Sequence, residues 1–177
     1  MRRMRERQRA KAAAPLIYER QDWHLFVDRQ TLPQKAGCEP DQVGRAVVKE
    51  IVDNALDAGA ENVAVVEGTP YRCHVIDNGP GLAPDDVPRL FAVNRPLISS
   101  KLKRLPTRGM LGNGLRVVMG AVAAFGGRVT VTTRGISYKL ATDTVTGLTK
   151  VVSVKEIGPA HPLDLMSWSN SPRPSSK

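Results

Sequence analysis

The chain has 177 residues, of which 41% are apolar and 24% are charged, and its formal net charge is +9. This length and composition predict one globular domain with a sizeable core, and they exclude a TIM barrel joined to a further domain. The longest apolar stretch, residues 117–125, is far shorter than the ~20 residues of a membrane span, so no membrane segment is expected.

Cysteine and histidine usage argues against disulfides and zinc. Cys38 and Cys73 stand far apart and form no CxxC motif, and the three histidines are isolated from one another. The basic N-terminus lacks the apolar segment of a signal peptide. We therefore expect a soluble protein of the reducing cytoplasm.

Residues 1–14 carry six basic side chains and one glutamate, which is +5 of the net charge of +9. They are predicted to form a flexible basic arm. The arm could be simply solvated, or it could contact the phosphates of a nucleic acid or another polyanion. The solvated arm is favoured, because no aromatic residue is interleaved with the charges for stacking on bases.

The first half of the remaining chain predicts helices and one hairpin. Residues 22–29 read as a strand or an extended lead-in. A helix is expected from Pro40 to about Ala58, where apolar residues recur at helical spacing and Gly59 follows as a stop. The β-branched segments 62–67 and 71–76 predict a hairpin, and a short helix is expected over 84–91.

The second half predicts a loop, a helix and a meander. Residues 92–111 show no periodicity and are expected to form a long loop of the kind that serves as a lid. A helix should follow to Phe125, and then come three antiparallel strands, expected over 128–134, 136–142 and 149–157. The chain is thus predicted to be an α+β two-layer sandwich over 15–157, with helices on one face of a mixed, mainly antiparallel sheet. Residues 158–177, rich in proline and serine, are expected to be a mostly disordered tail.

Three clusters could carry chemistry, and the first lies on the helix over 40–58. Glu50 and Asn54 are four residues apart, which places both on one helix face. They could satisfy each other or cap a neighbouring loop. Alternatively, Asn54 could bind a metal through its carbonyl oxygen while Glu50 polarises a water molecule. Asp53 and Asp57, on the adjoining face, are expected to be solvated.

The second cluster follows a strand, and the third opens a helix. In the segment 77–81, DNGPG, Asp77 could accept a hydrogen bond from a ligand amine, and Gly79 and Gly81 would let the backbone approach a flat ring, although an ordinary turn also fits. In the third, glycine-rich backbone before a helix offers free N–H groups to phosphates, or is only a flexible loop. This third cluster comprises Gly109, Gly112, Asn113, Gly114 and Leu115.

No Walker sequence is present, and the glycines do not follow a strand directly, which argues against a Rossmann site. Lys101, in the predicted lid, could close on a terminal phosphate or could be simply solvated. Taken together, the carboxylate, the amide, the aspartate, the glycines and the lysine suit Mg-ATP, with Glu50 as general base.

At these residues the sequence resembles the GHKL (Bergerat-fold) ATPase superfamily, which includes gyrase B, MutL, the ninety-kilodalton heat-shock chaperones and histidine kinases. Its ExxxN, DxGxG and GxxGxGL motifs match Glu50 and Asn54, the 77–81 turn, and residues 109–115, in order, within about residues 41–134. The sequence Ser99-Ser100-Lys101 before TRGMLGNGL looks most like the topoisomerase VI B-type branch.

The resemblance implies a role for each matching residue. Glu50 would activate the hydrolytic water, Asn54 would hold Mg²⁺, and Asp77 would bond the adenine amino group. The glycines at 79 and 81 would shape the adenine pocket, and Lys101 with the backbone of 112 and 114 would contact phosphates. Histidine kinases usually lack the carboxylate at the place of Glu50, and no segment with a phosphoacceptor histidine precedes the domain, so an ATPase is favoured over a kinase.

One departure from the family is visible near the C-terminus. The family often ends its nucleotide domain with a late strand carrying a Gly-Thr pair, and here Gly158-Pro159 and the tail stand in its place. The expected function is ATP binding with slow Mg-dependent hydrolysis, coupled through lid closure to association with a second copy or another protein. The alternative is an adaptor that binds ATP without turnover and holds nucleic acid through residues 1–14.

Overall fold

The computed structural model describes residues 22–69, 72–95, 113–158 and 164–169. The predicted basic arm, most of the predicted lid, Lys101, Gly109 and Gly112 lie outside these ranges. No helix within them combines the length and the apolar character needed to cross a bilayer.

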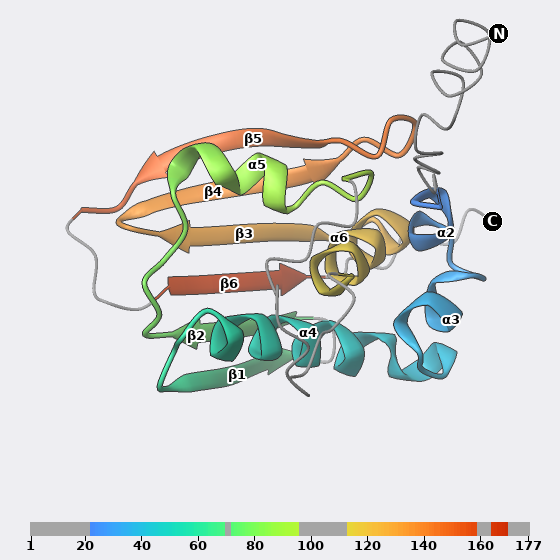
Figure 1. The fold of residues 1–177 in the computed structure, drawn as a ribbon, viewed down its shortest axis with the longest axis horizontal. Helices are drawn as coiled ribbons and strands as arrows, with labels where there is room; N and C mark the ends of the chain where they lie inside the picture. Colours follow the sequence, from blue (N-terminus) through green and yellow to red (C-terminus); the bar gives the residue numbers. More distant parts are fainter. Residues whose placement is uncertain (1–21, 70–71, 96–112, 159–163, 170–177) are drawn as a thin grey trace, which may run out of the picture.

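The described chain forms two layers, a sheet and a set of helices on one of its faces (Figure 1). The helical elements are α2 (His24–Val27), α3 (Leu32–Ala36), the 3-10 turn η1 (Pro40–Gln42), α4 (Val43–Asp57), the 3-10 turn η2 (Pro84–Asp86), α5 (Val87–Leu90) and α6 (Gly114–Phe125). The strands are β1 (Val63–Thr69), β2 (Arg72–Asp77), β3 (Arg128–Thr133), β4 (Ile136–Thr142), β5 (Thr149–Glu156) and β6 (Asp164–Ser169).

The sheet has the strand order β1-β2-β6-β3-β4-β5, and every described neighbour pair is antiparallel. The predicted α+β two-layer architecture, the hairpin and the meander are confirmed. The expectation of a mixed sheet is corrected to an antiparallel one, because short turns and the return of the last strand reverse the chain at each pairing.

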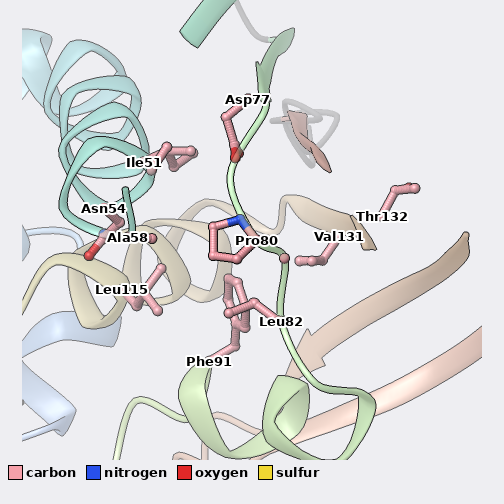
Figure 2. A pocket seen from close by; sticks show the side chains of 12 residues that line it. Ile51, Asn54, Ala58, Asp77, Pro80, Leu82, Phe91, Leu115, Val131 and Thr132 are labelled. Carbon is pink, nitrogen blue, oxygen red and sulfur yellow. The ribbon is translucent and has the colours of Figure 1, made fainter. Parts of the chain in front are cut away.

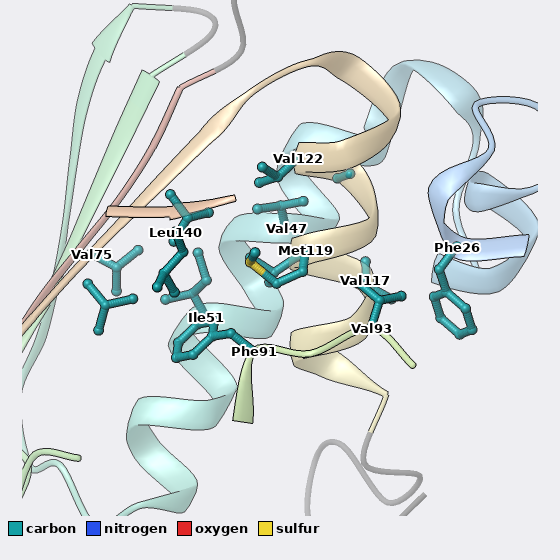
Figure 3. Packing of buried hydrophobic residues seen from close by; sticks show 14 of the residues in the cluster. Phe26, Val47, Ile51, Val75, Phe91, Val93, Val117, Met119, Val122 and Leu140 are labelled. Carbon is teal, nitrogen blue, oxygen red and sulfur yellow. The ribbon is translucent and has the colours of Figure 1, made fainter. Parts of the chain in front are cut away.

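The core lies between the sheet and the two long helices, α4 and α6 (Figure 3). On α4 the buried apolar residues recur every four positions, at Val43, Val47, Ile51 and Ala55, and so form one stripe. Helix α6 is buried over most of its circumference, and Met119 and Val118 are fully enclosed. The helix is therefore held by packing on several sides, which fixes its N-terminus relative to α4.

Two segments differ from what the sequence predicts. Residues 24–27 form the short helix α2 rather than a strand, because Phe26 packs against α6 and is only 1% exposed. Residues 164–169, in the predicted disordered tail, form β6 between β2 and β3. The inner edges of those two strands need backbone partners, and β6 supplies them. The predicted domain boundary at 157 therefore leaves out one strand of the sheet.

Candidate functional site

Helix α4 places Glu50 and Asn54 one turn apart, as predicted. The side-chain Nδ2 of Asn54 donates a 2.6 Å hydrogen bond to the backbone carbonyl of Glu50. This bond leaves the amide oxygen of Asn54 as an acceptor for another partner. The Glu50 side chain is 20% exposed, and its Oε1 lies 3.7 Å from Nζ of Lys49. Both groups are thus accessible rather than mutually satisfied.

The prediction that Asp53 is solvated is wrong. Asp53 is buried, 6% exposed, and its Oδ2 accepts a 2.8 Å hydrogen bond from Nζ of Lys49. This bond to Asp53 is the main reason that the pKa of Lys49 is raised, against the opposing effect of its own burial. The long lysine side chain lies along the helix and neutralises the buried carboxylate, so Asp53 has a structural partner. Asp57 is exposed, as expected.

The end of β2 forms a tight turn around Asp77. Its Oδ1 accepts a 2.8 Å hydrogen bond from the backbone N–H of Gly79. A Cβ on Gly79 would lie 2.8 Å from that same oxygen, and Gly81 has φ +72°, so both positions favour glycine. The glycines therefore serve the turn itself, and the turn presents Asp77 at the end of the strand.

Two residues that the sequence analysis did not assign to the site hold this turn in place. Oδ1 of Asn78 accepts hydrogen bonds of 2.9 Å from the backbone N–H groups of Glu61 and Asn62. Oγ1 of Thr133 accepts a 2.8 Å bond from the backbone N–H of Leu82. The signal for Asn78 was the Asp-Asn-Gly turn itself. The hydroxyl of Thr133 could be suspected from the sequence as a site group, but its bond to the turn follows only once β3 is placed beside it.

The N-terminus of α6 meets α4 at Gly114. A Cβ on Gly114 would lie 2.5 Å from Oε2 of Glu50 and 3.0 Å from Nδ2 of Asn54. The absence of a side chain thus lets the carboxylate approach the first turn of α6. Backbone N–H groups without a partner in the helix, and the positive end of the helix dipole, lie at this same turn. The structure therefore brings the first predicted cluster together with Gly114 of the third.

A pocket connects the three clusters (Figure 2). Its volume is about 640 Å³, a figure that includes open solvent at its mouth. Its lining comes from α4 and the residue after it, the end of β2 with the turn that follows, the residue after α5, and the helix α6 and strand β3: Ile51, Asn54, Ala55, Ala58, Asp77, Pro80, Gly81, Leu82, Phe91, Leu115, Val131 and Thr132. Most of these side chains are apolar, and the polar ones are Asn54, Asp77 and Thr132, which lie on different sides of the pocket (Figure 2). Such a mixture suits a flat ring with one polar edge.

The donor set can be tested against a divalent cation. Within the described ranges there is no group of three or more His, Cys, Asp or Glu side chains that could hold a metal. Mg²⁺ needs no such cage, because it commonly keeps several waters and is bound by one or two protein oxygens together with substrate phosphates. Among the described residues the amide oxygen of Asn54 has no hydrogen-bond donor, and its side chain lies close to the first turn of α6, which fits that pattern.

Residues 39–154 match the family described as histidine kinase-, DNA gyrase B-, and HSP90-like ATPases, and the chain therefore belongs to it. Membership implies ATP binding and agrees with the observed α+β Bergerat fold. The narrower resemblance to the topoisomerase VI B-type branch is not supported.

The relatives that are similar to this chain include DNA mismatch repair proteins named MutL. Identity is 35% over 91 residues with that of Herminiimonas arsenicoxydans, covering 49% of this chain and 15% of the relative. Identity with the MutL of Acidiphilium cryptum is 36% over 114 residues, which cover 61% of this chain and 18% of the relative. The chain thus spans less than a fifth of the length of these curated relatives.

Two solved structures have a similar arrangement of helices and strands. One is the N-terminal domain of a DNA repair protein, with a TM-score of 0.45, 20% identity and coverage of 71% of this chain and 34% of that one. The other is the ATP-binding domain of topoisomerase IV from Francisella tularensis, with a TM-score of 0.43, 15% identity and coverage of 72% and 36%.

Proposed function

We propose that this domain binds Mg-ATP in the pocket and hydrolyses it slowly, with Glu50 as the general base. The observation that carries the proposal is the approach of the Glu50 carboxylate to Gly114, at the first turn of α6. A base at that point stands beside the place where an anion is best stabilised. The terminal phosphate and the base would then share one end of the pocket.

The remaining assignments follow from the lining of the pocket. Asp77 would accept a hydrogen bond from the adenine amino group, with the ring between apolar side chains of α4 and β3. Asn54 would contribute an oxygen ligand to Mg²⁺, which when bound neutralises charge on the phosphates. The backbone at Asn113, Gly114 and Leu115 would face the phosphates. Lys101, Gly109 and Gly112 are assigned to phosphate binding on the motif alone.

Hydrolysis needs one proton transfer that this chain can perform. Glu50 takes a proton from a water molecule as the water oxygen bonds to the terminal phosphorus. The bond from that phosphorus to the bridging oxygen breaks, and ADP leaves with the electron pair. The coupling of nucleotide binding to association with a second copy or another protein belongs to the same proposal. Nucleic-acid contact through residues 1–14 stays a prediction that rests on their charge.

The substitution Glu50→Gln tests the assigned base. Glutamine keeps the shape beside Gly114 but cannot accept the proton, so phosphate release should fall roughly 10²–10⁴-fold. Affinity for a non-hydrolysable Mg-ATP analogue, measured by calorimetry, should stay close to that of the unmodified chain, because the adenine and phosphate contacts remain.

Glu156→Gln is the matched control, because Glu156 is an exposed glutamate on β5 that does not line the pocket. Its turnover should equal that of the unmodified chain. Retained hydrolysis in Glu50→Gln would exclude Glu50 as the base. A folded unmodified chain that binds no nucleotide would overturn the proposed function itself.

A further inference from the structure

Arg116 is the one charged residue of α6, and it is buried. It is 2% exposed in a helix whose other residues from 117 to 122 are buried apolar side chains and Gly120. Burying a guanidinium is costly unless hydrogen bonds and an opposite charge compensate it. The sequence signal was the single arginine inside the apolar segment 115–125, which the sequence analysis did not single out.

The guanidinium of Arg116 joins the start of α6 to two segments that are far from it in the sequence. Its Nε donates a 2.8 Å hydrogen bond to the carbonyl of Val93, three residues after the end of α5. Its Nη2 lies 3.1 Å from Oδ1 of Asp22, at the start of the described N-terminal segment. Its Nη1 donates a 3.3 Å hydrogen bond to Oδ1 of Asn113. The guanidinium carbon also stands 4.5 Å from the ring centroid of Phe26.

The N-terminal end of this network is itself anchored. Oδ2 of Asp22 accepts a 3.2 Å hydrogen bond from Nζ of Lys35, on α3. Burial raises the pKa of Asp22, but the hydrogen bonds and charges of Lys35 and Arg116 outweigh it, and the pKa ends below its usual value. Asp22 therefore stays ionised at neutral pH and compensates the buried arginine.

The contact with Arg116 determines the orientation of the Asn113 amide. An arginine can only donate hydrogen bonds, so the atom of Asn113 that faces it must be the carbonyl oxygen. The amide nitrogen is thereby kept on the other side, as a donor. Asn113 directly precedes Gly114, where Glu50 approaches α6. A fixed donor at this position suits an anionic oxygen of a phosphate.

We propose that Arg116 is a positioning residue for phosphate binding, and that it makes the affinity for a nucleoside triphosphate depend on Asp22. The inference rests on the proposed nucleotide site and adds a link between that site and the N-terminal segment. If Asp22 is neutralised, the buried guanidinium loses its counter-charge. The hydrogen bond from Arg116 to Asn113 is then weakened. By linkage, triphosphate binding stabilises the Asp22–Arg116 contact to the same extent.

The test is a double-mutant cycle of Asp22→Asn and Asn113→Ala in the full chain. Each variant is titrated with a non-hydrolysable Mg-ATP analogue and, by competition, with adenosine, which lacks phosphates. We expect Asp22→Asn to weaken analogue binding by about 5-fold or more, within the usual range of coupling between sites. Adenosine affinity should not change. In the Asn113→Ala background, Asp22→Asn should have little further effect, because the residue through which it acts is gone.

Asp28→Asn is the matched control, since it neutralises an exposed carboxylate in the same N-terminal segment. It should leave both affinities unchanged. Three results would overturn the inference: unchanged analogue binding in Asp22→Asn, a proportional loss of adenosine binding, or additive effects in the double variant. In each of them the unmodified chain still binds the analogue and the proposed function stands. If the unmodified chain binds no nucleotide, both the proposed function and the inference about Arg116 are contradicted.

Discussion

At the scale of single residues, Asp77 illustrates how one carboxylate can serve the turn and the pocket. Its Oδ1 accepts the backbone N–H of Gly79, and the residue lines the pocket. Asparagine could keep the bond to Gly79 through its own oxygen. Its amide nitrogen would then replace the second oxygen, so a donor would face the pocket instead of an acceptor.

We therefore expect Asp77→Asn to weaken binding of the Mg-ATP analogue about 10–100-fold, the usual cost of leaving a buried polar group unpaired. The fold should remain, because the turn keeps its hydrogen bond. Isothermal titration with ATP and GTP analogues checks this. GTP carries an acceptor where ATP carries the amino group, so its affinity should not fall in the variant. An equal loss for both nucleotides would show that Asp77 does not read the base.

The positions of single residues could be predicted where the spacing of residues along the chain already determines where their side chains lie. The spacing of Glu50 and Asn54 placed both on one helix face, and the turn motif placed Asp77 at a strand end. Prediction failed for Asp53 and Arg116, because their burial depends on which elements pack against α4 and α6. Helical periodicity describes a side chain's direction from its own helix but not what lies in that direction.

At the scale of elements, β6 is the feature on which the sheet depends. It pairs with β2 over residues 164–169 and with β3 over 165–169, so it joins the β1-β2 hairpin to the β3-β4-β5 meander. We expect a chain ended after residue 163 to lose several kcal/mol of the ~5–15 kcal/mol that stabilises a domain. A chain ended after residue 169 should be much less affected. Urea unfolding followed by circular dichroism measures the difference, and equal midpoints would contradict it.

The sequence does contain a weak signal for β6. Met166 and Trp168 alternate with Ser167 and Ser169, which is the period of a strand. The surrounding prolines and serines obscured it, since they are typical of disordered segments. The opposite error occurred at α2, where a short apolar segment fits a strand as well as a helix. Its contact with α6 decides between them, and a local pattern does not contain that contact.

At the scale of the whole molecule, stability at acid pH depends on carboxylates held in their ionised form. The hydrogen bond from Lys150, followed by bonds from the backbone N–H groups of Val145 and Thr146, lowers the pKa of Asp143 from 3.8 to about 2. The pKa of Asp22 is also lowered. A pKa that is lower in the folded state contributes stability above the unfolded value, and this contribution disappears as pH falls through the folded value.

The melting temperature should therefore be nearly constant between about pH 7 and 5 and should fall steeply from about pH 4 to 2. Asp143→Asn should reduce the steepness of that fall, because one carboxylate that must be protonated is gone. Thermal melts across this pH range check it. Asp85→Asn removes an exposed carboxylate outside this turn and serves as control. The same slope in both variants would remove Asp143 as a cause of acid unfolding.

The place of β6 also has a consequence for how the protein is made. Residues 164–169 leave the ribosome after all other strands of the sheet, yet they lie at its centre (Figure 1). Until they emerge, the hairpin and the meander each keep an open inner edge, and such edges can pair with other chains. Completion of the sheet therefore has to follow translation of this segment. The nascent chain should depend on slow elongation or chaperone shielding until then.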